Sequence, residues 1–241
     1  IPIPDLTLLS KLSSYYELSE LMGSMQSQLI NGSIKRIEIT CYGRAEDSKS
    51  ISLSFLKGFL SNITDNRINF LNASSVADER GIVVSNSFSS DKIPFTNKIK
   101  SVVYSDNEVF QVSGSVFGKE FFRITEIMGF EVDLKPKGRM LFVKNKDVPG
   151  VIGKVGTILG LEKVNISGYL LSKVEEKNFA YSIIKVDNEN ARVGIGTTIP
   201  AALFQVGTGI TMDGKGMEVV GVITAKQFIG AGINTAATTT L

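Results

Sequence analysis

The sequence has no histidine and no tryptophan, and its only cysteine among 241 residues is Cys41. Without histidine, the chain cannot supply a Ser-His-Asp triad, a Cys-His pair, a histidine general base or a histidine-ligated zinc. A single cysteine forms neither an internal disulfide nor a thiolate metal site, so we expect no metal site. Cys41 stands in a β-rich run without a base or ligand nearby in sequence, which favours a structural role. Nothing requires an oxidising compartment, and a cytoplasmic location is the default expectation.

Excess charge of one sign and long apolar runs are also missing. Lys and Arg number 26 against 24 Asp and Glu, a net charge of +2. This near balance argues against a chain that mainly binds nucleic acid or an anionic membrane. No apolar run approaches the ~18 residues of a membrane span, and no signal peptide is recognisable. The chain begins with Ile1 rather than Met, which indicates a fragment or a processed product.

The composition changes near Asn190. Hydrophobic residues make up 43% of the whole chain, which is typical of a globular protein with a core. Residues 191–241, however, hold nine Gly, nine Thr and only five charged residues. We therefore expect a globular region over 1–190, followed by an irregular β-rich tail.

Hydrophobic periodicity predicts an α+β fold for the globular region. Helices are expected from Asp5, over 15–30, over 50–60 and over 74–80. Strands that form a mainly antiparallel sheet are expected over 33–42, 82–88, 98–104, 108–116, 121–127 and 130–135.

After Gly138 the predicted order is strand, helix, strand, strand, the first three-quarters of a βαββαβ unit. The four elements are expected over 139–144, 151–161, 165–173 and 179–186. Gly153, Gly156 and Gly160 weaken the helix by roughly 1 kcal/mol each relative to Ala. This cost is tolerable if small residues let the helix approach the sheet closely.

The loop before this helix carries the most informative polar residues. Pro149 suits a first helical turn, and Gly150 allows close approach of a ligand or backbone. Free N–H groups at the helix start suit a carboxylate, Asp147 can receive an amine, and Asn145 can serve either group. Asn165, at the turn before the next strand, could complete a site for an amino acid zwitterion. Alternatively, these side chains only satisfy backbone groups of turns.

Two segments carry a resemblance to known families. RMLFVKNKDVPGVIGKVGTILGLEKVNISGYLLSK, followed by FAYSIIKVD, resembles an ACT regulatory domain. Before it, LSFLKGFL, NASSVADERGI, VSGSVFG and MGFEVDLKPKG resemble the C-terminal half of long-form D-3-phosphoglycerate dehydrogenase over about 1–189. The resemblance implies a helical segment from the end of the catalytic half (1–32), an intervening regulatory domain (33–136) and an ACT domain (137–190), before the tail.

The family oxidises 3-phosphoglycerate with NAD on the way to L-serine, and its catalytic half is not in this chain. No strand-linked GxGxxG fingerprint occurs, so we expect neither catalytic residues nor a cofactor here. The resemblance implies a regulatory fragment that carries effector binding and oligomerisation. L-serine or another small amino acid, bound between ACT domains of a homo-oligomer, would favour one subunit arrangement.

By position, the resemblance also implies site residues. The effector site would comprise Asn145, Asp147, Val148, Gly150, Asn165 and Ile166. Some family members bind an anion or the phosphorylated substrate at the intervening domain. On charge grounds alone, the candidate phosphate partners are Arg80, Lys119, Arg123 and Arg139. The alternative for these four is ordinary solvated surface.

The sequence departs from the ACT pattern after residue 187, where no second helix and no fourth strand are recognisable. Their loss would expose part of one sheet face and an unpaired edge. We expect a weakened ACT portion unless it dimerises or the tail covers it. VGIGTTIPAALFQVG and GVITAKQFIGAG resemble phage tail-fibre repeats, as in a fusion or a misjoined reading frame. Two alternatives to the dehydrogenase role therefore stay open, a stand-alone amino acid sensor and a structural phage-type fusion.

Overall fold

A computed structural model describes residues 6–43, 45, 47–91, 97–118, 121–173, 179–187, 210–213 and 216–219. The chain divides into two compact units, Ile1–Ala191 and Arg192–Leu241. In the second unit, β10 (Ile210–Asp213) and β11 (Gly216–Val219) form an antiparallel hairpin. All further description concerns the first unit.

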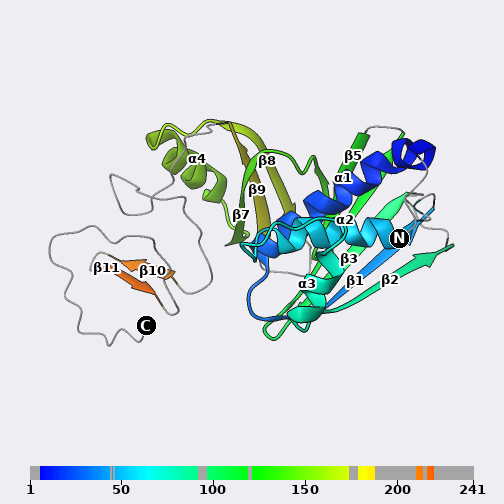
Figure 1. The fold of residues 1–241 in the computed structure, drawn as a ribbon. Coiled ribbons are helices and arrows are strands. Elements are labelled where there is room, and N and C mark those ends of the chain that lie inside the picture. The colour runs from blue at the N-terminus through cyan, green and yellow to red at the C-terminus, as the bar shows by residue number, and fades with distance from the viewer. Residues whose placement is uncertain are drawn as a thin grey trace, which may run out of the picture. The chain divides into compact units, whose positions relative to one another are not determined.

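The first unit contains four helices and nine strands among its described residues (Figure 1). Its helices are α1 (Leu6–Leu29), α2 (Ser48–Leu60), α3 (Ala73–Glu79) and α4 (Val151–Leu161). Its strands are β1 (Ile34–Tyr42), β2 (Val83–Ser89), β3 (Lys98–Ser105), β4 (Val109–Phe117), β5 (Phe121–Ile127), β6 (Phe130–Leu134), β7 (Arg139–Lys146), β8 (Ile166–Lys173) and β9 (Phe179–Val186). The predicted α+β class is confirmed.

Six strands form a sheet in the order β2-β1-β3-β4-β5-β6. Among the described strands of this sheet, only β1 and β2 pair in parallel. Helices α2 and α3 lie between them in sequence and provide the crossover that parallel strands need. The other neighbours pair antiparallel. A mainly antiparallel sheet was predicted and is found.

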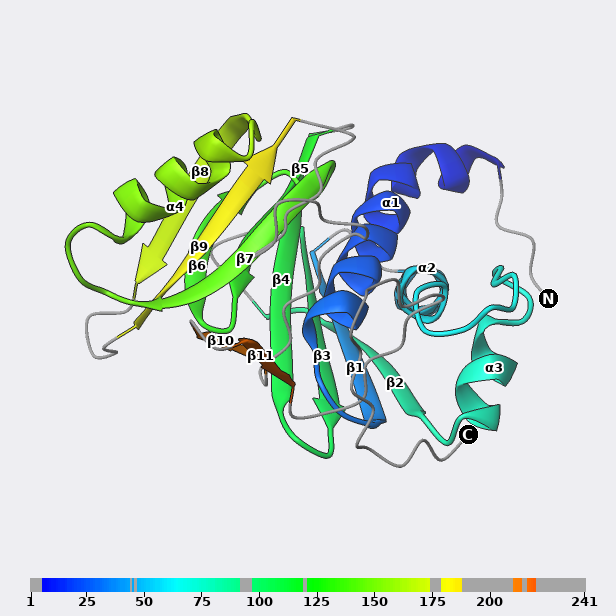
Figure 2. The same ribbon diagram turned by 90° about the vertical axis from the view of Figure 1, so that its left-hand side faces the viewer.

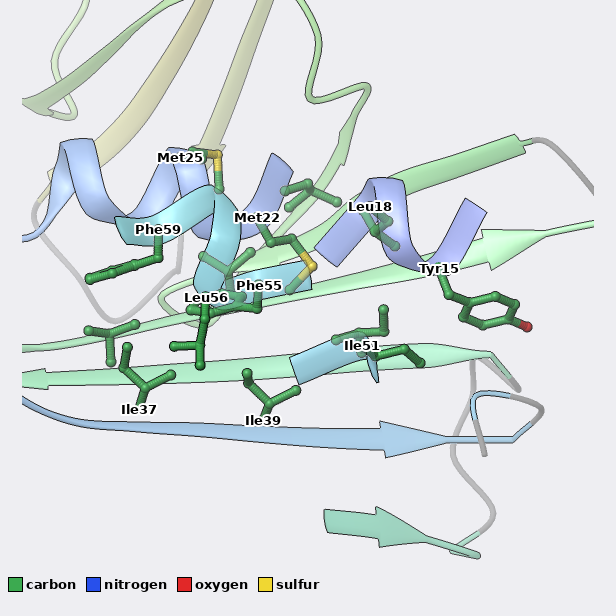
Figure 3. Packing of buried hydrophobic residues seen from close by; sticks show 14 of the residues in the cluster. Tyr15, Leu18, Met22, Met25, Ile37, Ile39, Ile51, Phe55, Leu56 and Phe59 are labelled. Carbon is green, nitrogen blue, oxygen red and sulfur yellow. The ribbon is translucent and has the colours of Figure 1, made fainter. Parts of the chain in front are cut away.

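Helices α1 and α2 cover one face of this sheet (Figure 2). Strand β1 alternates because Ile37, Ile39 and Cys41 face the helices and are fully buried. Phe55 and Phe59 of α2 stack one turn apart in the same core, with 5.8 Å between ring centroids (Figure 3). The sequence predicted a separate helix from Tyr15, whereas α1 is one continuous helix that packs into this core.

Glycines permit the close crossing of α1 and α2. A Cβ atom on Gly58 would lie 1.9 Å from the carbonyl oxygen of Glu20, and one on Gly23 would lie 2.2 Å from that of Phe55. In α4, by contrast, a Cβ atom added to any of the three glycines would meet nothing within 4 Å; these are Gly153, Gly156 and Gly160. The condition under which the cost of the α4 glycines is tolerable, a close approach to the sheet, is therefore not met at these three positions. The close glycine contacts lie between α1 and α2.

Strands β7, β9 and β8 form a second, antiparallel sheet in that order. One face of this second sheet packs against β6 of the six-stranded sheet. The Phe130 ring of β6 meets the Tyr181 ring edge-on at 4.8 Å between centroids, and Ser172 Oγ donates to the carbonyl oxygen of Glu131 at 2.9 Å. The predicted strand, helix, strand, strand order is present.

Candidate functional site

The loop between β7 and α4 holds the candidate effector residues. Gly150 precedes the helix in a left-handed conformation, with φ of 92°, which glycine adopts without strain. Gly150 occupies the N-cap position and has no side chain that could cap the helix. The N–H groups of the first helical turn therefore face the loop and carry the positive end of the helix dipole.

A hollow of about 390 Å³ lies beside this loop. The lining residues are Asn145, Asp147, Val148, Pro149, Gly150, Val151, Ile152 and Leu171. The structure thus brings together four of the six predicted effector residues. Sequence reasoning missed Leu171 and Ile152 as lining residues, because their placement depends on strand register and on the helix start.

A hydrogen-bonded chain supports the hollow from the sheet. Tyr169 OH donates to Ser182 Oγ at 3.0 Å, and Ser182 Oγ donates to Asn145 Oδ1 at 3.1 Å. Ser182 is fully buried, so its hydroxyl gains from both partners. These two hydrogen bonds hold the Asn145 carboxamide at the edge of the hollow, whereas Asp147 lies exposed on the rim.

Asn165 and Ile166 lie elsewhere. The Asn165 amide donates to Asp187 Oδ2 at 3.1 Å, and Ile166 pairs with Val186 at the far end of the sheet. The distance along β8 from Asn165 to Leu171 is about 20 Å at 3.3 Å per residue. Within one copy, Asn165 and Asn145 therefore do not converge on one small ligand.

The four candidate anion-binding residues do not form one cluster among the described residues. Arg80 is exposed at the end of α3, which packs beside β2, whereas Arg123 stands on β5, four strands away in the sheet order. Four strand spacings amount to about 19 Å. Arg139 begins β7 and is exposed, and Lys119 lies outside the described residues.

Arg123 already has partners within the protein. Its Nε lies 3.0 Å from Asp133 Oδ1, and its guanidinium stacks 3.8 Å from the centroid of the Phe121 ring. An anion bound there would compete with the Asp133 carboxylate. The role of Arg123 as a phosphate partner stays a prediction.

Other reactive groups are scarce in the described part of the chain. Burial, and secondarily the Asp47 charge, raises the pKa of the Cys41 thiol to about 12, so Cys41 is a poor nucleophile. No group of three or more acidic or cysteine side chains there could hold a metal ion. None of the helices there is both long and apolar enough to cross a membrane.

Part of this architecture matches a known protein family. Residues 11–128 match the D-3-phosphoglycerate dehydrogenase intervening domain. The chain is related to D-3-phosphoglycerate dehydrogenases through this domain. The matched residues include most of α1 and the six-stranded sheet as far as β5.

Curated D-3-phosphoglycerate dehydrogenases are similar over a longer stretch. The Archaeoglobus fulgidus protein is 32% identical over 165 residues, which are 68% of this chain and 31% of that protein. The Bacillus subtilis protein is 31% identical over 180 residues (74% and 34%), and the Methanocaldococcus jannaschii protein 33% over 183 residues (75% and 34%). The chain spans about a third of the length of these relatives. The resemblance of the tail to tail-fibre repeats finds no support among these relatives.

Proposed function

We propose that the chain is the regulatory portion of a cytoplasmic D-3-phosphoglycerate dehydrogenase, which binds an amino acid effector and does not itself catalyse. NAD-dependent oxidation of 3-phosphoglycerate would be carried out by a catalytic region outside these residues. The match of the intervening domain supports the family assignment. The observation that carries the effector role is the hollow where Asn145, Asp147 and the start of α4 meet.

The geometry of the hollow suits an amino acid zwitterion. The carboxylate would accept hydrogen bonds from the N–H groups of the first turn of α4, where the helix dipole favours negative charge. The ammonium group would lie against the Asp147 carboxylate on the rim. Asn145, held by Ser182, would bind either group. A small effector such as L-serine is the first candidate.

The position of Asn165 favours a site shared between two copies. Asn145 and Asn165 mark opposite ends of the three-stranded sheet. An antiparallel arrangement of two such sheets would bring the loop of one copy beside Asn165 of the second. We therefore propose a homo-oligomer in which each effector bridges two copies.

Contacts at the same end of the sheet provide a route for regulation. Asn145 pairs with Ala180 of β9. The rings of the two residues beside Ala180, Phe179 and Tyr181, both contact the Phe130 ring of β6 in the six-stranded sheet. An effector that moves the loop would therefore act on β9 and on this aromatic contact. Regulation would then be a shift between two arrangements of the ACT portion and the intervening domain.

Isothermal titration of the full chain with L-serine tests the effector role. We expect saturable binding that Asp147→Asn weakens about 10-fold or more, because a charge-assisted hydrogen bond contributes about 1.5–3 kcal/mol. Asp65→Asn removes the same charge from an exposed loop and should bind like the parent chain. Equal affinity of parent and Asp147→Asn would contradict the proposed site, and no binding of serine, glycine or alanine would contradict the effector role.

A further inference from the structure

Strand β2 is an open edge of the six-stranded sheet. It pairs with β1 on one side and ends the strand order on the other (Figure 1). Five of its seven residues are exposed, including Val83 at 63% and Phe88 at 44%. Its pairing with β1 runs without a bulge from Val83 to Ser89. The strand therefore presents a regular row of backbone groups to an incoming strand.

The other edges of the two sheets differ from β2. The edges β6 and β8 meet each other: Ser172 of β8 donates to the Glu131 carbonyl of β6, so both edges are partly covered. At β7, Arg139 and Lys144 are exposed and repel a second copy of the same strand. The sequence of β2, VVSNSFS, has no charge and no proline, the two common protections of an edge.

We propose that β2 pairs antiparallel with β2 of a second copy, about a two-fold axis through Asn86. An axis perpendicular to the sheet keeps each face on its own side, so Asn86 meets its counterpart. Val84 then lies opposite Phe88 on the helix-covered face, and Ser85 lies opposite Ser87 on the other face. The result is one continuous sheet built from two intervening domains. This inference does not depend on the proposed effector site.

The residues that this register brings together are complementary. Val84, Asn86 and Phe88 lie beside Ile37, Ile39 and Cys41, and therefore share the core side of the sheet. On this side of the sheet, Val84 of each copy lies opposite Phe88 of the other copy. A β-branched residue opposite an aromatic one is a favoured pair across antiparallel strands. On the other face, hydroxyl groups meet hydroxyl groups.

The absence of charge in β2 also suits a second copy of the same chain as the partner. Pairing two copies of VVSNSFS places no like charges opposite each other within the strands. Antiparallel pairing sets the α3 end of each strand beside the Asp91 end of its partner.

A lysine in the paired strand tests the association. Sedimentation equilibrium of the full chain should give a mass for Ser85→Lys that is half that of the parent. Ser75→Lys places the same charge on exposed α3 and should leave the parent mass unchanged. Circular dichroism of each variant verifies the fold. Equal masses of the parent and Ser85→Lys would overturn the proposal.

A disulfide across the axis tests the register. Directly opposed Cα atoms lie about 4.5–5.5 Å apart, within the range for a disulfide. Oxidised Asn86→Cys should therefore run as a covalent dimer, while buried Cys41 keeps the background of the parent chain low. Ser75→Cys, exposed on α3, should stay uncrosslinked. Failure of Asn86→Cys to crosslink, or equal crosslinking of Ser75→Cys, would overturn the register and with it the proposal.

Discussion

Gly58→Ala should destabilise the protein because it places a methyl group between two helix backbones. The new Cβ atom would lie 1.9 Å from the Glu20 carbonyl oxygen and 2.8 Å from the Glu20 carbonyl carbon. Ordinary Cβ contacts begin at 3.4 Å, so α1 and α2 must separate by about 1 Å or more. Both obstacles are main-chain atoms and cannot rotate away.

The magnitude follows from two opposing effects. Overpacking a core costs about 1–3 kcal/mol, and a contact with main chain belongs at the upper end. Alanine returns about 1 kcal/mol through its higher helix propensity. We therefore expect a net loss of about 2 kcal/mol in the free energy of unfolding, measured by urea denaturation and circular dichroism.

A matched substitution in α4 should instead raise the free energy of unfolding. Gly156 lies within α4, and a Cβ atom there would meet nothing within 4 Å. Gly156→Ala should therefore stabilise the chain, by up to about 1 kcal/mol. Unchanged or increased stability of Gly58→Ala would refute the close crossing of α1 and α2.

Three further predictions concern buried and capping groups. Gln26→Leu should cost about 1–3 kcal/mol in chemical denaturation, because the Gln26 amide donates to the Phe110 carbonyl at 2.9 Å in a fully buried site; unchanged stability would contradict this contact. Asp47→Ala removes the α2 cap and should cost about 1 kcal/mol. Tyr16 OH donates to Asp47 Oδ2 at 3.1 Å, and burial and, secondarily, the Asp47 charge raise the pKa of Tyr16 to about 12. Asp47→Ala should therefore also lower this pKa in ultraviolet titration, and an unshifted titration would contradict the hydrogen bond. The Cys41 thiol has a pKa of about 12 in the folded protein, against 9.0 for a free thiol. Because folding raises this pKa, the thiol should contribute stability that is complete below pH 9.0 and lost as the pH rises towards 12. Cys41→Ala should lack this loss when unfolding is measured as a function of pH.

The fold class was predictable because hydrophobic alternation is a local signal. Ile37 and Ile39 alternate in a strand, and Leu53, Leu56 and Leu60 recur at helical spacing, so both elements could be predicted. The continuous α1 could not, because no local signal distinguishes one long helix from two short ones. The Gly23–Gly58 crossing depends on which helices meet, and local sequence does not encode that.

The candidate site was predictable only in part. A proline and glycine before a helical pattern predict a loop and a helix start, so Asp147 and Gly150 could be placed together. Leu171 lies in the hollow because of the β8–β9 register, which sets which residues share a face. Asn165 was expected near Asn145, but strand length separates the two within one copy.

Hydrogen exchange of the full chain, with and without L-serine, tests the regulatory account most directly. Bound effector should slow exchange in residues 147–152, and its effect should extend through β9 to β6 at Phe130–Leu134. Asp147→Asn at the same serine concentration should show neither change. Unchanged exchange at 147–152 at saturating serine, glycine and alanine, or a change that stops before β6, would contradict the account.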